Sequence, residues 1–360
     1  MNHPGQSPEG EEAAMQTPGI AVVGAGQWGK NIVRNFAALP SCRLVALCDR
    51  DPQVLAAHGA ELPQVALTRE YAEILQRDDV QGVAVAAQAV AHAELAQRAL
   101  EAGKDVFVEK PLSLTTEDAE RMCRTADAGD RLLMVGHLLL YHPAVEKMLQ
   151  LVAEGDLGEM RYITAQRVNL GTVRTDENAL WSLAPHDLSI INEIFNELPV
   201  VVSARGAAYL QPGVEDVVFL SLRYPRDRMA HVHVSWLDPH KERRTTLVGS
   251  QKMLVFDDMQ VQEKIRIYDK GVGPAGFVSY EESLTVRQGD IVIPRVKMAE
   301  PLRTECGHFI DCILSRRAPR TDGWSGLRVV QLLEAAQTSL RNDGVPITVE
   351  ALAQRKEQRA

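Results

Sequence analysis

The 360-residue sequence is poor in cysteine and lacks the cysteine spacing of a metal site. Its five cysteines form no C-x-x-C pair, so their spacing does not predict zinc binding, and we expect no bound metal. An odd number of cysteines also argues against a framework of disulfides. We therefore expect reduced thiols, as in a cytoplasmic protein.

The sequence also lacks the segments that direct a chain into or across a membrane. Residues 1–17 are rich in Pro, Gly and Glu and contain neither the basic segment nor the apolar core of a signal peptide. We expect these residues to form a disordered tail. The longest apolar stretch, 132–141, is much shorter than the roughly 20 residues needed to span a bilayer. A soluble protein without a membrane partner is expected.

Positive charge is in the minority. The chain has 39 Lys and Arg residues against 48 Asp and Glu residues, which gives a formal net charge of −9. Nucleic acid is therefore not an expected partner, because phosphate backbones require a basic face. A single pocket can still be basic, so an anionic small molecule remains a possible ligand. The length suggests two domains.

Residues 18–140 alternate short apolar runs with amphipathic segments. Apolar side chains recur at helical spacing at Ile32, Phe36 and Leu39, and Asp51-Pro52 has the composition of a helix start. Gly59, Gly103 and Gly129 are expected at helix ends. The predicted strands are 20–23, 44–48, 65–67, 83–86, 106–108 and 132–135. Strands that alternate with helices predict an α/β, doubly wound parallel sheet of the Rossmann type.

Residues 141–345 follow a different rhythm, with one helix to about Val152 and then longer alternating segments. Ala230, Val232, Val234 and Trp236 share one face of a segment whose other face is polar, which is typical of a half-buried antiparallel strand. A helical run follows from about residue 302 to 340. We expect a substrate-binding and oligomerisation domain of the α+β class, with a mostly antiparallel sheet, and a C-terminal tail over 346–360.

The segment Gly24-Ala-Gly-Gln-Trp-Gly29 has the G-x-G-x-x-G pattern of a dinucleotide site. It follows the first predicted strand and opens a helix, and Asp49 ends the second strand. Asp49 is expected to accept hydrogen bonds from the ribose hydroxyls and to repel a 2′-phosphate, which favours NAD. Arg50 keeps NADP as an alternative. The predicted cofactor-binding residues are Gly24, Gly26, Gln27, Trp28, Gly29, Asp49, Arg50, His92, Glu109 and Lys110.

The fifth strand runs into Glu109-Lys110-Pro111, at the edge of a parallel sheet where ligands bind. With GAGQWG, AHAELAQRALEAGKDVFVEKPL and VGHLLLYHPAV, the chain resembles the Gfo/Idh/MocA family of oxidoreductases along nearly its whole length after the tail. The resemblance implies an NAD(P)-dependent dehydrogenase that acts on CH–OH groups. It also implies that Lys110 and His186 are the catalytic residues, flanking the nicotinamide and the sugar hydroxyl.

The sequence departs from the family pattern at one position near His186. The family usually has an aspartate four residues before this histidine, whereas this chain has Ser182. Whether the serine hydroxyl takes over the part of the carboxylate is left open. Asp187 is adjacent in sequence and points off the same helix face, so it is given no chemical role.

A polar segment over 165–181 precedes His186 and contains two arginines. Arg167 and Arg174 are candidates to bind a phosphate or carboxylate, because guanidinium groups bind such anions bidentately. Tyr141, Asn169 and Trp181 are further candidates for substrate contact. The segment also resembles the branch of the family that contains bacterial nucleotide-sugar dehydrogenases. That branch implies oxidation of the 3-hydroxyl of a UDP-N-acetylglucosamine-type sugar to a 3-keto sugar, for later amination in surface glycan or lipopolysaccharide synthesis.

Three alternatives remain at this stage. One is a dehydrogenase for inositol or another free sugar, and another is an NAD-dependent glycosidase without net redox change. The third is a cofactor-binding regulatory protein that catalyses no reaction. The strand faces expected to be exposed in the second domain also predict a homodimer or homotetramer.

Overall fold

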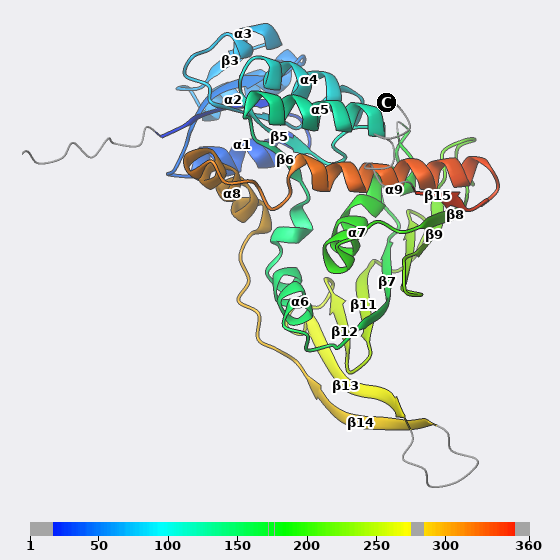
Figure 1. Cartoon of the computed structure of the whole chain (residues 1–360). Helices are drawn as coiled ribbons and strands as arrows, with labels where there is room; N and C mark the ends of the chain where they lie inside the picture. The colour runs from blue at the N-terminus through cyan, green and yellow to red at the C-terminus, as the bar shows by residue number, and fades with distance from the viewer. Residues whose placement is uncertain (1–16, 172, 176, 275–283, 350–360) are drawn as a thin grey trace, which may run out of the picture.

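Two β-sheets organise the chain, one in each half of the sequence (Figure 1). The computed structural model describes residues 17–171, 173–175, 177–274 and 284–349. Nearly all of the predicted N-terminal tail and most of the predicted C-terminal tail lie outside these ranges. The first sheet has the strand order β3-β2-β1-β4-β5-β6, and the second has the order β14-β13-β12-β11-β7-β10-β9-β8-β15.

The first sheet is parallel throughout, as the alternating pattern predicts. β1, β4, β5 and β6 are buried at every position, which fits strands covered on both faces. Its strands are β1 Gly19–Val23, β2 Arg43–Cys48, β3 Ala66–Thr68, β4 Gly82–Val85, β5 Asp105–Glu109 and β6 Leu133–Gly136. Its helices are α1 Gly29–Ala38, α2 Pro52–Glu61, α3 Tyr71–Leu75, α4 Ala89–Glu101 and α5 Thr116–Gly129. The six predicted strands are confirmed.

Local signals account for some helix ends in this half. The side chain of Asp51 accepts a hydrogen bond from the backbone N–H of Gln53 at 2.8 Å and caps α2, as predicted. Gly103 follows α4 with φ +76°. The prediction for Gly59 is wrong, because α2 continues past it to Glu61. Gly59 lacks the positive φ that stops a helix.

The second sheet is mostly antiparallel, with one parallel pair at its centre. β10 runs antiparallel to β9 but parallel to β7, so the predicted antiparallel strand has one antiparallel and one parallel neighbour. The predicted alternation of buried and polar side chains along β10 is confirmed. The strands are β7 Met160–Val168, β8 Val201–Ala207, β9 Val217–Arg223, β10 Met229–Ser235, β11 Glu242–Gly249, β12 Met253–Asp257, β13 Ile265–Pro274, β14 Leu284–Val292 and β15 Ile347–Thr348.

Helices α6 Pro143–Ala153, α7 Ala179–Phe195 and α9 Gly323–Arg341 cover one face of this sheet (Figure 1). A short 3-10 helix, η1 Leu138–Tyr141, leads from β6 into α6. The predicted helical run at 302–340 is two helices, α8 Pro301–Ser315 and α9, because Arg316 takes a left-handed conformation with φ +54°. None of the helices in the described ranges is long and apolar enough to cross a bilayer.

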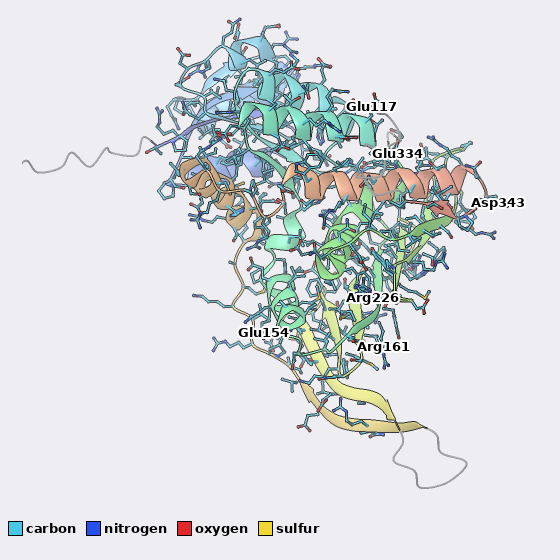
Figure 2. All side chains as sticks on the ribbon, viewed as in Figure 1. Glu117, Glu154, Arg161, Arg226, Glu334 and Asp343 are labelled. Carbon is cyan, nitrogen blue, oxygen red and sulfur yellow. The ribbon has the colours of Figure 1, made fainter. Side chains whose placement is uncertain are left out.

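Helix α8 follows β14 of the second sheet in the sequence but packs against the first half of the molecule. Its Phe309 ring lies 6.3 Å from Phe36 of α1 and 5.9 Å from Phe107 of β5. Helix α9 then crosses to the second sheet, and Figure 2 shows its Glu334 near Glu117 in the first turn of α5. Glu334 accepts a hydrogen bond from the backbone N–H of Thr116, the first residue of α5, at 3.2 Å. Residues from the end of the chain therefore complete the core of the first half and connect the two halves.

Candidate active site

The glycines of the G-x-G-x-x-G turn have different structural roles. Gly24 has φ +85°, and a Cβ added there would lie 2.6 Å from the backbone nitrogen of Ala87. A Cβ on Gly29 would lie 1.8 Å from the carbonyl oxygen of Gly24. A Cβ on Gly26 would meet nothing within 4 Å. Gly24 and Gly29 thus make the turn possible, whereas Gly26 borders open space at a helix start, as expected where a pyrophosphate approaches.

Asp49 lies at the end of β2, beside this turn. One carboxylate oxygen accepts a hydrogen bond from the backbone N–H of Ala25 at 2.8 Å, and the other accepts one from Asp51 at 2.9 Å. Arg50, the next residue, is exposed. The acid is therefore fixed next to the glycine turn, and the turn and the acid together fit a dinucleotide cofactor.

Trp28 connects the glycine turn to the end of β5. Its indole N–H donates a hydrogen bond to Glu109 Oε1 at 2.6 Å, although the residue is 44% exposed. The other oxygen of Glu109 accepts one from the backbone N–H of Lys110 at 3.2 Å. Burial raises the pKa of Glu109. Gln27 is exposed on the turn. Trp28 and Glu109 therefore hold the turn next to Lys110.

A second buried acid, Glu305, lies near Glu109 and was not among the predicted site residues. Glu305 is on α8, and neither of its carboxyl oxygens has a hydrogen-bond partner within the ranges that the structure describes. Burial and the negative charge of Glu109 raise the pKa of Glu305 well above its ordinary value. One sequence signal could have suggested this burial: Glu305 is spaced at helical intervals from Leu302, Cys306 and Phe309 and therefore shares their apolar helix face.

His92, a predicted cofactor contact, lies between the segments that follow β4 and β5. The ring is buried, with Nδ1 2.7 Å from the carbonyl oxygen of Pro111 and Nε2 3.0 Å from that of Ala87. Burial lowers its pKa. A neutral imidazole has one N–H to donate, so it bonds to one of these carbonyl oxygens at a time. The ring connects the segments that follow β4 and β5, and we assign it a positioning part.

Lys110 reaches from the end of β5 to helix α7. Its Nζ donates a hydrogen bond to the backbone carbonyl oxygen of Ser182 at 3.0 Å. Pro185 lies inside α7, which runs unbroken past it, and proline has no N–H to donate to the carbonyl oxygen four residues earlier. Burial lowers the pKa of Lys110. Ser182 thus contributes its carbonyl oxygen to the contact with Lys110.

His186 follows Ser182 by one helical turn on α7. Its Nδ1 is buried and is not hydrogen-bonded to any residue of the described chain. Burial, followed by the positive charges of Arg167 and Lys110, lowers its pKa well below 6.5. The imidazole is therefore neutral at neutral pH and can accept a proton. His137, at the end of the first sheet, is also buried, and its pKa is lowered to about 4, by burial and then by Lys110.

Arg167 and Asp187 form a buried ion pair beside His186. The Nε and Nη2 groups of Arg167 donate to the two oxygens of Asp187 at 2.8 and 2.9 Å. The predicted guanidinium fork for a substrate anion is therefore occupied by a carboxylate of the protein. Asp187, which received no role from the sequence, orients Arg167 through this bidentate contact.

The remaining substrate candidates lie in different surroundings. Tyr141 is buried, and its hydroxyl lies 3.1 Å from Thr321 Oγ1, so its contact with the sugar stays a prediction. The centroid of its ring lies 5.6 Å from that of His308 on α8. Asn169 is partly buried just after β7.

Two further candidates from the polar segment have partners within the chain. Arg174 is about half exposed and forms an ion pair with Glu177 at 2.9 Å. The indole N–H of Trp181 donates to Gln337 on α9 at 3.1 Å. These contacts fix both side chains near the start of α7, and their contact with substrate stays a prediction.

Comparisons with known proteins identify the family of the whole arrangement. Residues 19–137 match the oxidoreductase family with an NAD-binding Rossmann fold, and residues 145–255 match the Gfo/Idh/MocA C-terminal domain. The chain is 25% identical to UDP-N-acetylglucosamine 3-dehydrogenase of Acidithiobacillus ferrooxidans, over 93% of this chain and 98% of that protein. It is 27% identical to inositol 2-dehydrogenase of Salmonella agona, over 49% and 54% of the two chains.

Solved structures share the fold. A structure of the Acidithiobacillus ferrooxidans enzyme superposes with a TM-score of 0.76 over 90% of this chain and 97% of that one, at 22% identity. A structure of GenD2 from gentamicin A biosynthesis, in complex with NAD, gives a TM-score of 0.78 over 96% and 100%, at 23% identity. The sequence matches cover both halves of the chain, and we conclude that the protein belongs to the Gfo/Idh/MocA family of oxidoreductases.

Proposed function

We propose that the protein is an NAD-dependent dehydrogenase that oxidises the 3-hydroxyl of a UDP-N-acetylglucosamine-type sugar. The observation that carries this proposal is the juxtaposition of Lys110 and His186. Lys110 leaves the cofactor half and bonds to Ser182, one turn before His186 on α7. A basic group and a neutral imidazole thus come together where the two halves of the molecule meet, which suits the removal of a proton from an alcohol.

The two side chains have complementary tasks. His186 is neutral because its pKa is lowered, so it can take the proton of the sugar hydroxyl as a general base. Lys110 can donate a hydrogen bond to the same oxygen and stabilise the negative charge that develops there. The nicotinamide cofactor, when bound, supplies the hydride acceptor. The hydrogen bond from Trp28 to Glu109 holds the glycine turn next to Lys110.

Asp49 supports NAD over NADP as the cofactor. Its carboxylate is fixed beside the glycine turn, where a negative charge favours ribose hydroxyls and repels a 2′-phosphate. Arg50 is exposed and adjacent, which keeps NADP as the alternative.

The uncovered face of the second sheet supports assembly into a homodimer or homotetramer. Tyr162, Phe219 and Met229 are 45%, 44% and 51% exposed on β7, β9 and β10. Apolar side chains gathered on one sheet face are typical of a protein interface. All five cysteines are buried and unpaired, which supports a cytoplasmic protein. In that compartment its 3-keto product would supply an amination step of surface glycan or lipopolysaccharide synthesis.

The substrate is tested with purified protein, NAD or NADP, and a panel of UDP-sugars, myo-inositol and free sugars. We expect nicotinamide reduction with UDP-N-acetylhexosamines or their uronates, at higher kcat/KM with NAD than with NADP. Reduction with inositol alone would contradict the proposed substrate. Release of sugar without accumulation of reduced cofactor would instead identify a glycosidase.

A further inference from the structure

Two arginines lie directly opposite each other on neighbouring strands of the second sheet. Arg243 on β11 is the register partner of Arg167 on β7. Arg243 is two residues before the buried Thr245 on β11. Side chains two residues apart in a strand share a face, so Arg243 lies on the inner face of the sheet, the face covered by α7. Like charges directly opposite each other destabilise a sheet unless they are compensated.

The protein neutralises the charges of these two arginines to different extents. The charge of Arg167 is matched by its bidentate contact with Asp187. Arg243 reaches Asp258 only at 3.6 Å, which is longer than a hydrogen bond, and its side chain is 40% exposed. Asp258 is also shared with Lys264, whose Nζ lies closer, at 3.3 Å. Arg243 therefore carries a positive charge that the protein neutralises incompletely.

This charge lies near the reacting groups. Asp187, which holds the neighbouring Arg167, directly follows His186 on α7. Arg243 is also one of the cations that lower the pKa of His186, after burial, Arg167, Lys110 and His137. The surroundings of the proposed base are thus cationic on the sheet side as well as on the Lys110 side, although the protein as a whole is acidic.

We propose that Arg243 is a specificity-determining residue that binds an anionic group of the substrate. This inference rests on the proposed function and names the substrate class more closely: a sugar that carries a carboxylate or a diphosphate within reach of His186. The guanidinium group can bind either anion through two N–H groups. Asp258 holds it loosely enough to leave N–H groups for a ligand.

The test compares wild type with Arg243→Gln and with Arg244→Gln as the matched control. Arg244 is the next residue on β11, is exposed on the opposite face of the strand and pairs with Glu242 at 3.7 Å. Initial rates with NAD are measured for UDP-N-acetylglucosamine and for its uronate. We expect Arg243→Gln to lower kcat/KM at least tenfold, while Arg244→Gln leaves it unchanged.

The two substrates separate the sources of the anion. A loss confined to the uronate identifies a sugar carboxylate as the bound group, whereas an equal loss for both substrates identifies the diphosphate. Unchanged rates with Arg243→Gln, or equal losses in the two arginine variants, would overturn the proposal.

A binding measurement keeps this test independent of the proposed reaction. If wild type oxidises neither UDP-sugar, the proposed function fails, and glucuronate and pyrophosphate are titrated calorimetrically into NAD-loaded protein. We then expect wild type and Arg244→Gln to bind one of these anions at least tenfold more tightly than Arg243→Gln does. Equal affinity in all three proteins, or no binding to wild type, would overturn the assignment of Arg243.

Discussion

The Nζ of Lys110 lies 3.0 Å from the carbonyl oxygen of Ser182, one helical turn before His186. This contact joins the carboxyl end of β5 to helix α7, and therefore the cofactor half of the molecule to the second half. Pro185 lies within the same stretch of α7. The contact brings a cation and a neutral imidazole together in a buried place, which is the basis of the following predictions.

Replacement of His186 tests its part as the base. We expect His186→Asn to lower kcat by a factor of about 10² to 10⁴, because the alcohol loses its proton acceptor. His231→Asn is the control, since His231 is exposed on β10, and it should retain wild-type kcat. NAD affinity, measured by fluorescence titration, should be the same in both variants. Wild-type turnover in His186→Asn would refute the assignment.

The pH dependence of kcat/KM follows from the lowered pKa of His186. A neutral imidazole is required, so activity is retained as the pH falls through 6.5 and declines only near the lower pKa of the folded protein. Initial rates measured from pH 8 downwards show whether the acidic limb begins only below pH 6.5. A midpoint at or above 6.5 that disappears in His186→Asn would show that the environment of the histidine is not as described.

Asp187→Asn should destabilise the fold. The substitution leaves the buried Arg167 guanidinium without its carboxylate, and the removal of one partner of a buried pair costs about 3 to 5 kcal/mol. Glu242→Gln, which removes the carboxylate of the exposed pair with Arg244, should cost about 1 kcal/mol or less. Urea unfolding of the two variants measures the difference, and equal losses would contradict a structural role for Asp187.

Acid should destabilise the protein partly through His137. Its pKa is lowered to about 4 in the folded protein, so the unfolded chain binds more protons between the ordinary histidine pKa and that value. The free energy of unfolding therefore falls as the pH drops through this window, by up to about 3 kcal/mol from this group. His137→Gln should lose less stability than wild type between pH 6.5 and 4, as measured by urea unfolding. A parallel decline in both proteins would be evidence against the buried neutral ring.

Asp49 sets the choice of cofactor in this account. Asp49→Ala removes the negative charge beside the glycine turn, so we expect KM for NADP to fall relative to KM for NAD. The ratio of kcat/KM for the two cofactors measures the change. An unaltered ratio would mean that other residues select the cofactor.

Local patterns in the sequence were sufficient to predict the first sheet. Each strand there is a short apolar run bounded by turn residues, and the G-x-G-x-x-G turn and Asp49 lie where that pattern puts them. The positions of Lys110 and His186 came from family resemblance, and the structure adds the Ser182 carbonyl that joins their elements.

Contacts between distant segments could not be predicted in this way. The return of α8, which brings Glu305 toward Glu109, depends on the path of the chain and not on any local period. The same holds for the pairing of Arg167 with Arg243, since register between β7 and β11 is set by the topology of the whole sheet. Tyr141 is buried beside Thr321, and an aromatic residue next to a site has the same local pattern whether it lines the site or packs in the core.

The transfer of hydride from the sugar tests the central claim most directly. Wild-type protein is incubated with NAD and UDP-N-acetylglucosamine or its uronate, deuterated at C3, and the reduced cofactor is analysed by mass spectrometry. We predict that reduced cofactor accumulates with one deuterium from the sugar, and that His186→Asn forms almost none. Reduced cofactor without deuterium, or sugar turnover without reduced cofactor, would contradict oxidation at the 3-hydroxyl.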